Sequence, residues 1–279
     1  FIDTGLISYS LPIMFMTILG TILHWTDVIM LGFFSDANTV GLYHPAARTA
    51  GIIRIVLLSF TGIYGPIMAE MYAKNEVASM NSIFKLVTRW IITFSLPFSI
   101  LILLYPKKIM LIFGSEFVSG HSILVILVMA TMIQAVFGVG GTTLTMTGYP
   151  KINLINTFIA CSLNIVLNII FIPIYKGQGA ALSTLITLAS IALIRIFQNW
   201  ILLKLLPFNL KIFKPLLAGL VAFGVGVFIK SFIVSFHTII TLLFAGIIIF
   251  VTFFIILWLL KFDKDDYNLL KGIQILIKG

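Results

Sequence analysis

Four charged side chains interrupt the long apolar stretches of this sequence: Asp27, Arg48, Arg54 and Arg195. A charge at the centre of a membrane costs about 2.5–3.5 kcal/mol on insertion scales, so such side chains usually face a cavity or an opposite charge. Three of the four are arginines, whose planar guanidinium groups bind carboxylate and phosphate oxygens bidentately. These residues could therefore bind an anionic group inside a membrane.

Arg48 and Arg54 fall on one side of the same predicted helix, because each helical residue advances about 100° around the axis. This spacing predicts that both arginines line a hydrated cavity and attract an anionic substrate group such as phosphate. Asp27 lies at a similar predicted depth on the preceding span, with His24 one turn away on the same face. The alternative is that Asp27 and Arg48 form a buried pair that joins two helices. Arg54, which is deeper, has no evident partner at its level.

Other polar residues in the spans have two possible roles. Arg195 lies near the inner end of its span, so it could contact substrate or extend its charged head group to the membrane surface. Asn153 and Asn156 belong to a polar stripe along residues 151–174, and Gln134 lies in a similar stripe of the preceding span. Such residues are typical both of helix interfaces, where asparagine bonds across helices, and of cavity walls. The predicted substrate-binding residues are His24, Asp27, Arg48, Arg54, Gln134, Asn153, Asn156 and Arg195.

The sequence contains no recognisable catalytic motif. Its four histidines show no HExxH or other ligand spacing, and neither a GxSxG motif nor a phosphate-binding P-loop is present. The single cysteine, Cys161, gives neither an intramolecular disulfide nor a cysteine cluster. We therefore predict that the protein is not an enzyme and has no catalytic residues, no metal site and no cofactor.

Composition sets the class of protein. Of the 279 residues, 60% are hydrophobic and only 10% are charged, and the mean hydropathy is +1.16, whereas soluble domains carry about 25% charged residues. A membrane span needs roughly 20 apolar residues. The sequence predicts an all-α integral membrane protein of about eight transmembrane helices, at residues 9–34, 41–72, 86–105, 120–147, 151–174, 179–204, 213–235 and 238–260.

The loops indicate an orientation. If the first span runs outward, the outer loops hold only Lys107, Lys108, Lys176 and Lys230, and the remaining loop lysines and arginines lie inside. This bias predicts a multi-pass protein of the cytoplasmic membrane with both ends of this chain cytoplasmic. It also accounts for the net charge of +9 without a nucleic-acid partner. Residues 263–279 have the spacing of an amphipathic helix on the inner surface, with a disordered tail as the alternative.

The ordered motifs resemble the second half of the oligosaccharide flippases, in the multidrug/oligosaccharidyl-lipid/polysaccharide exporter superfamily. The resemblance covers nearly the whole chain, with no single decisive motif. Its clearest segments are Ser10-Leu11-Pro12, Thr26-Asp27, Ala46-Ala47-Arg48, Gly148-Tyr149-Pro150-Lys151, Asn164 and Asn168 before Ile172-Pro173, and Gly177-Gln178-Gly179-Ala180-Ala181.

This resemblance implies two six-helix lobes around a central cavity that opens alternately to the two membrane faces. It implies a polyprenyl-(pyro)phosphate sugar as substrate, for polysaccharide biosynthesis or export, and membrane lipid and a coupling proton or sodium ion as further partners. Arg48 and Arg54 match the helix that supplies basic cavity residues in the family, and Asp27 matches an acidic position. The implied units are a six-helix lobe at residues 1–205, two additional transmembrane helices at 206–262 and a cytoplasmic tail at 263–279.

Because the resemblance covers only the second lobe, we expect a fragment that lacks the first lobe; a half-length protein that dimerises is the alternative. Three other functions were weighed. A cation-coupled multidrug exporter would favour acidic cavity residues, of which only Asp27 is available. A membrane enzyme of polysaccharide assembly would need a large outer loop or clustered carboxylates. A structural subunit would pair all four buried charges with one another.

Overall fold

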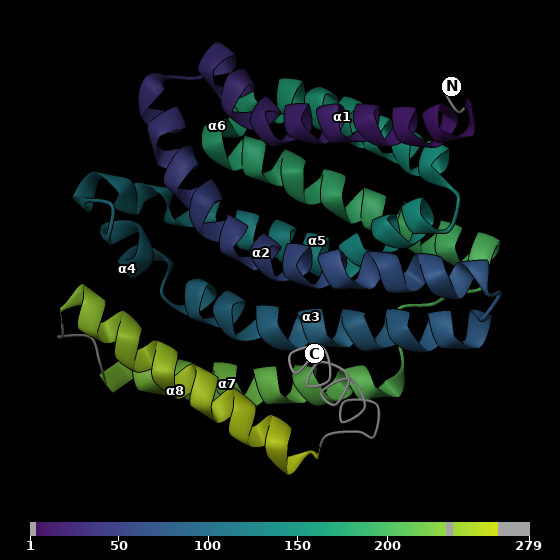
Figure 1. Cartoon of the computed structure of the whole chain (residues 1–279). Helices are drawn as coiled ribbons and strands as arrows, with labels where there is room; N and C mark the ends of the chain where they lie inside the picture. The colour runs from purple at the N-terminus through teal and green to yellow at the C-terminus, as the bar shows by residue number, and fades with distance from the viewer. Residues whose placement is uncertain (1–3, 233–236, 262–279) are drawn as a thin grey trace.

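The computed structural model describes residues 4–232 and 237–261, and this part of the chain is a bundle of helices that run side by side (Figure 1). The predicted tail at 263–279 lies outside the described residues. The helices are α1 (Thr4–Phe34), α2 (Ala37–Ala73), α3 (Val77–Leu104), α4 (Pro106–Leu111), η1 (Ser115–Gly120), α5 (His121–Met146), α6 (Pro150–Leu203), η2 (Leu210–Ile212), α7 (Phe213–Phe232) and α8 (Thr238–Leu259).

The 54-residue helix α6 is a hairpin of two helices. Lys176 breaks it with a left-handed φ of 49° and a ψ of −128°. The two halves lie side by side, as shown by the amides of Asn156 and Gln198, which exchange hydrogen bonds of 2.6 and 2.9 Å. Seven helical stretches of the described chain are long and apolar enough to cross a membrane, and the α6 hairpin crosses twice. The predicted all-α membrane fold with about eight spans is therefore confirmed.

Helix α3 begins at Val77, nine residues before the predicted span at 86. The additional first turns carry Met80 and Phe84, which belong to the buried core although polar residues separate them in the sequence. Helix α4 and the 3-10 turn η1 were also not predicted. These short elements turn the chain between α3 and α5.

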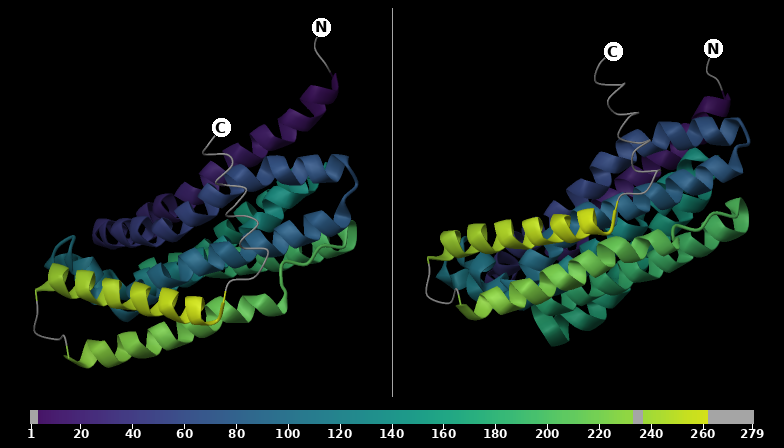
Figure 2. Two further views of the ribbon diagram at one scale, coloured as in Figure 1. Left: turned by 60° about the horizontal axis from the view of Figure 1, so that its bottom comes forward. Right: turned by 90° about the horizontal axis from the view of Figure 1, so that it is seen from below.

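Two apolar cores hold the helices together. The larger joins α2, α3, α5 and α6, with Ile53, Tyr64 and Leu124 almost completely buried. The second joins the end of α3 to α7 and α8 around Ala222, Ile249 and Phe253. Accordingly, α7 and α8 lie on the far side of α3 from α1 (Figures 1 and 2). The large core carries the framework around the candidate site, and α7 and α8 are added outside it.

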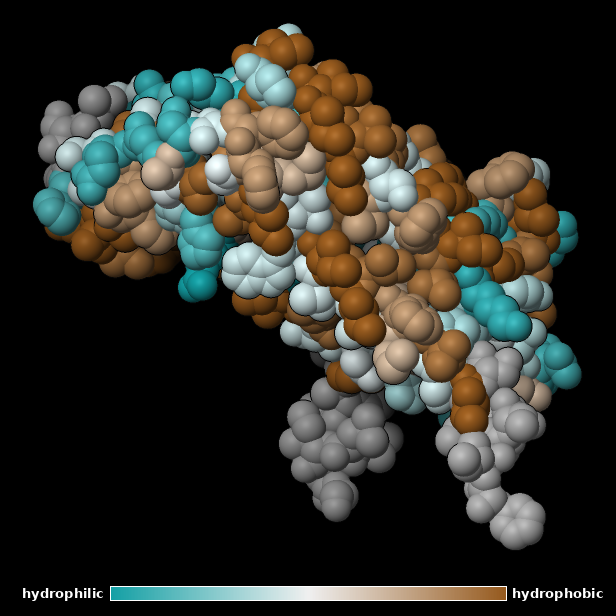
Figure 3. All heavy atoms as spheres, turned by 90° about the horizontal axis from the view of Figure 1, so that it is seen from above, coloured by the Kyte–Doolittle hydropathy of each residue, from teal (hydrophilic) through white to brown (hydrophobic). Residues whose placement is uncertain are grey.

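The surface of the bundle is strongly apolar. Large side chains such as Phe33, Leu220 and Trp258 remain 85%, 70% and 68% exposed. Figure 3 shows hydrophobic residues dominating the middle of one face, with hydrophilic residues concentrated toward its ends. Such a surface suits the hydrocarbon of a bilayer and not water. Together with its spans, this surface makes the chain a multi-pass membrane protein.

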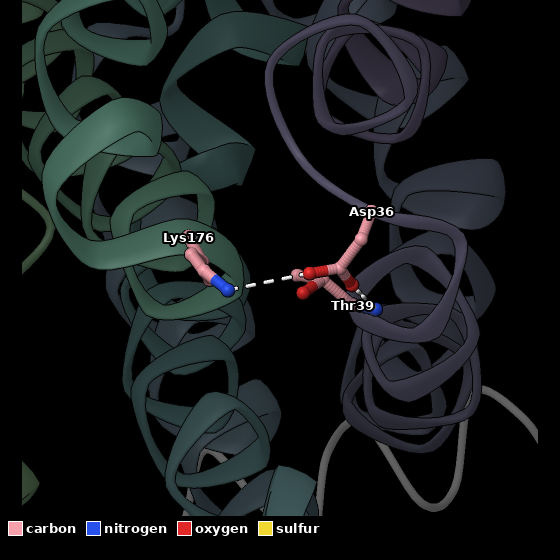
Figure 4. A network of polar contacts seen from close by, with 3 residues as sticks. All are labelled: Asp36, Thr39 and Lys176. Carbon is pink, nitrogen blue, oxygen red and sulfur yellow. Dashed lines mark hydrogen bonds and ion pairs between the residues drawn. The ribbon is translucent and has the colours of Figure 1, made fainter.

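One end of the bundle is fastened by polar contacts between the α1–α2 turn and the α6 bend (Figure 4). The Asp36 carboxylate caps α2 by accepting a 2.7 Å hydrogen bond from the Thr39 backbone N–H. It also lies 3.2 Å from the Lys176 ammonium. The Thr39 N–H and the Lys176 charge lower the pKa of Asp36 below its ordinary value. Because the ion pair is exposed, we expect it to orient this turn more than to stabilise it.

Replacing Gly179 with alanine should destabilise the α6 hairpin. A Cβ at this position would lie 2.2 Å from the Phe171 carbonyl oxygen, and a backbone atom cannot rotate away as a side chain can. We expect Gly179→Ala to lower the melting temperature of the detergent-solubilised chain by about 5 °C or more. Gly224→Ala in α7 is the matched control, because its Cβ meets nothing within 4 Å. Equal melting temperatures for the two variants would contradict this hairpin geometry.

Candidate functional site

A cavity of about 740 Å³ lies between four elements, lined by residues within 16–28 of α1, 43–58 of α2, 127–142 of α5 and 153–195 of α6. The fold brings these helices together because α5 packs between α2 and α6, while α1 lies along α6. Seven of the eight predicted site residues line this cavity: His24, Asp27, Arg48, Arg54, Gln134, Asn153 and Arg195. Their predicted contact with substrate remains a prediction.

Asp27 is only 6% exposed, and neutral donors surround its carboxyl group. The Tyr43 hydroxyl donates a 2.6 Å bond to Oδ2, and the Thr184 hydroxyl donates to the same oxygen. The side-chain amides of Asn164 and Asn168 donate to Oδ1 at 3.2 and 2.8 Å. The carboxyl group of α1 is thus tied to α2 and to both halves of α6 by hydrogen bonds.

These contacts decide between the two roles that the sequence left open for Asp27. Within the part of the chain that the structure describes, Asp27 and Arg48 form no ion pair, and neither Arg48 nor Arg54 has a hydrogen bond or an ion pair. The ion pairs found there join Lys74 to Glu70 and Lys176 to Asp36, outside the cavity. Arg48 is exposed and Arg54 is half-buried in the cavity wall. Both arginines therefore present positive charges to the cavity that no carboxylate of the described chain neutralises.

Arg195 is turned toward the start of α6 and toward α5. Its Nη2 donates a 3.0 Å hydrogen bond to Oδ1 of Asn153, at the start of α6. Its guanidinium lies against α5, where a Cβ built on Gly141 would be 2.9 Å from Cζ. The glycine therefore permits this close approach. Arg195 is a third guanidinium in the cavity wall, held by an amide and not by a carboxylate.

Asn156 is the one predicted site residue that lies outside the cavity wall. Its amide pairs with Gln198 across the α6 hairpin, and it is not among the residues that line the cavity. In the asparagine stripe of α6, only the residues that turn toward α1 and α5 reach the cavity, and Asn156 turns toward the other half of its own hairpin. Asn156 therefore has a structural contact where a substrate contact was predicted.

Sequence reasoning missed several cavity residues. Tyr43 and Thr184 were not proposed, because a single tyrosine or threonine in an apolar run carries no distinctive spacing. Asn164, which lines the cavity, and Asn168, which also bonds to Asp27, were noted only in the resemblance, although their spacing of four residues places both on one helix face. Trp25 and Gly141 also line the cavity. Only the pairing of the α6 halves, which joins residues distant in the sequence, could have revealed Thr184.

The cavity has the groups needed to bind and orient an anion. Guanidinium groups of α2 and α6 supply fixed positive charge, and hydroxyl and amide groups of α5 and α6 supply neutral hydrogen bonds. Next to the low-dielectric walls of a cavity such charges act more strongly than in bulk solvent. The fold and the site define a polytopic membrane protein of the transporter class.

Comparison with known proteins identifies the family. A family model described as MatE matches residues 12–170, more than half of the chain, so the chain belongs to the MatE family. This family lies in the exporter superfamily named by the sequence resemblance, which is confirmed. Membership places the chain among transporters and not among enzymes.

One relative is the "Probable low-salt glycan biosynthesis flippase Agl15" of Haloferax volcanii, 28% identical over 186 residues. The match covers 66% of this chain and 39% of the relative. The chain thus spans less than half of this relative's length.

Two solved structures share the fold. The lipid II flippase MurJ, in an inward closed conformation, matches with a TM-score of 0.70 and 16% identity, over 85% of this chain and 51% of MurJ. A MATE crystal structure in the straight conformation matches with a TM-score of 0.60 and 20% identity, over 81% of this chain and 53% of that chain. At these identities the likeness concerns the fold alone.

Removing the Asp27 carboxyl group should destabilise the bundle, because buried donors from three helices would lose their acceptor. An unsatisfied buried donor costs about 1–3 kcal/mol. We therefore expect Asp27→Ala to lower the melting temperature by at least about 5 °C. Asp27→Asn, which keeps one acceptor oxygen and the side-chain volume, should lower it less. Thermal unfolding in detergent measures both, and equal losses for the two variants would count against the hydrogen-bonded role of Asp27.

Proposed function

We propose that this six-helix lobe forms half of the cavity of a lipid-linked oligosaccharide flippase, which moves a polyprenyl-(pyro)phosphate sugar across the cytoplasmic membrane by alternating access with a second lobe. The observation that carries this proposal is that Arg48, Arg54 and Arg195 line one cavity, where no carboxylate of the described chain pairs with them. Polysaccharide biosynthesis or export is the process that would use this transport.

The positive charge of the cavity wall favours an anionic ligand. A guanidinium held in a low-dielectric cavity is costly until an anion neutralises it, and a phosphate group matches its donors bidentately. A lipid-linked sugar provides such a phosphate and keeps its long apolar tail in the bilayer. The cavity volume of about 740 Å³ lies within the usual range for pockets that bind small molecules, about 300–1,000 Å³.

The comparisons support this choice of substrate. The Haloferax volcanii relative carries a name that refers to glycan biosynthesis, and the fold is shared with a lipid II flippase. The predicted orientation, with both ends of this chain cytoplasmic, would place the bend at Lys176 outside and Asn153 near the inner surface. Lipid and the lipid-linked oligosaccharide are the proposed partners.

A cation-coupled multidrug exporter is the second candidate. A buried carboxyl group at Asp27, amid hydroxyl and amide groups, could exchange a proton or bind sodium, and a MATE structure shares the fold. Coupling at Asp27 would also be compatible with a flippase. The arginine-rich cavity wall opposes a cationic drug as substrate, because like charges repel. A structural subunit is not favoured, since Asp27, Arg48, Arg54 and Arg195 form no ion pairs with one another in the part of the chain that the structure describes.

Arg54→Ala should reduce glycolipid transport at least about tenfold, because loss of a charge-assisted hydrogen bond costs about 1.5–3 kcal/mol. The measurement is the fraction of lipid-linked oligosaccharide that reaches the outer leaflet in cells producing the natural full-length chain. Arg54→Lys should retain part of the transport, since it keeps the charge but loses the planar fork.

Lys151→Ala is the matched control, because it removes an exposed positive charge outside the cavity wall. The Lys151→Ala variant should transport glycolipid as fast as the parent protein does. The comparison requires that all variants are present in the membrane in equal amounts. Unchanged glycolipid transport by Arg54→Ala would contradict the proposal. Faster export of a lipophilic cationic dye by that same variant would favour the multidrug alternative.

A further inference from the structure

Arg54 of α2 and Arg195 of α6 line the cavity from separate walls, and residue counts along the two helices place them at a similar level. Tyr43 of α2 and Thr184 of α6 both donate to Oδ2 of Asp27, which places these two residues at a common depth. From there, α2 and the second half of α6 both run away from the end of the bundle at which Asp36 pairs with Lys176. Arg54 comes eleven residues after Tyr43 (43 to 54), and Arg195 eleven after Thr184 (184 to 195). At 1.5 Å per residue, each arginine is about 16 Å beyond the Asp27 cluster.

The two guanidinium groups are held very differently. Arg195 is fixed by its hydrogen bond to Asn153 and by its contact with Gly141. Asn153 is itself anchored, because its amide nitrogen donates to the Gly141 carbonyl at 3.0 Å and to the Thr145 hydroxyl at 2.9 Å. Arg54 has no hydrogen bond in the described chain, so it can follow a ligand. One wall therefore offers a rigid cation and the other an adaptable one.

Within the part of the chain that the structure describes, most N–H donors of Arg195 have no protein partner. A guanidinium has five N–H donors, and Asn153 takes one of them. The Nε atom is enclosed and has no partner, while the residue lines the cavity beside Gly141. A buried polar group without a partner costs about 1–3 kcal/mol. An anion in the cavity would supply the partners that the described chain does not.

We propose that Arg54 and Arg195 form a two-sided clamp for a single phosphate-type oxyanion, with Asn153 as the positioning residue that fixes Arg195. This inference rests on the proposed function and adds the place of the anion and the residues that hold it. The clamp lies about three helical turns from the Asp27 cluster, so the anion and a coupling cation would occupy different parts of the cavity.

Asn153→Asp tests the clamp without removing any arginine. The new carboxylate would lie where Oδ1 now accepts the Arg195 hydrogen bond, and it would neutralise the guanidinium internally. If Arg195 had only a structural role, this ion pair would leave anion binding unchanged and stability equal or higher. If Arg195 binds the anion, stability stays equal or higher and binding weakens.

The experiment measures the affinity of the full chain, in nanodiscs of zwitterionic phosphatidylcholine, for polyprenyl diphosphate and for inorganic pyrophosphate. Asn153→Asp and Arg54→Gln should each weaken binding about tenfold. The affinity of the double variant should fall by less than the product of the two single fold-losses, because Arg54 and Arg195 hold the same anion. Asn156→Asp is the matched control, since it adds the same charge to α6 beside Gln198, off the cavity wall.

Parent-like affinity in Asn153→Asp, or multiplicative losses in the double variant, would overturn the clamp. Binding of pyrophosphate alone, weakened by Asn153→Asp, would support the clamp with a free anion as its ligand and would count against a lipid-linked substrate. Glycolipid transport that depends on Arg54 but not on Asn153→Asp would overturn the clamp and leave the proposed function standing.

Discussion

The structure depends on how one buried carboxyl group is satisfied. Asp27 lies inside a membrane protein with three arginines in the same cavity wall, and the simplest compensation would be an ion pair with Arg48. Neutral donors of α2 and α6 take that place, with the Tyr43, Asn168 and Thr184 bonds reaching Asp27 from different helices. Because hydrogen bonds already satisfy the carboxyl oxygens, the positive charge of the arginines is not neutralised by Asp27. A cavity lined by such charge is suited to an anionic ligand.

The α6 hairpin makes this arrangement possible. Its bend at Lys176 returns the chain so that Asn164 and Thr184 lie at one level beside Asp27. The same hairpin brings Asn153, at its start, against Arg195, near its end. Small residues of α5 complete the site, because a side chain at Gly141 would displace the guanidinium. The α6 hairpin thus supplies both the hydrogen-bond donors for Asp27 and the amide that holds Arg195.

The class of protein, the number of spans and the charged residues of the cavity wall could be predicted from the sequence, because the cost of burying charge in lipid marks residues such as Arg54 without any knowledge of tertiary contacts. The partners of those residues could not be predicted. Asp27 and Arg48 are close in predicted depth, yet helix rotation directs Asp27 toward α6. Asn153 and Asn156 occupy one stripe, but the offset of three residues between their positions rotates the side chains relative to each other around the helix. Asn153 therefore reaches the cavity, whereas Asn156 contacts the other half of the hairpin. The depth of a residue along its helix follows from counting residues, whereas the direction in which its side chain points depends on how the helices pack.

The most direct test of this account is a double-mutant cycle between Asp27 and Arg48, with thermal unfolding measured for Asp27→Asn, Arg48→Gln and the variant that carries both. Residues that share no interaction give additive losses, to within about 0.3–0.5 kcal/mol, whereas paired residues couple by up to about 3 kcal/mol. The account predicts additive losses, because Asp27 is bound by neutral donors and Arg48 faces the cavity. A favourable coupling of about 1.5 kcal/mol or more would mean that the carboxylate neutralises the arginine, and would contradict the central claim.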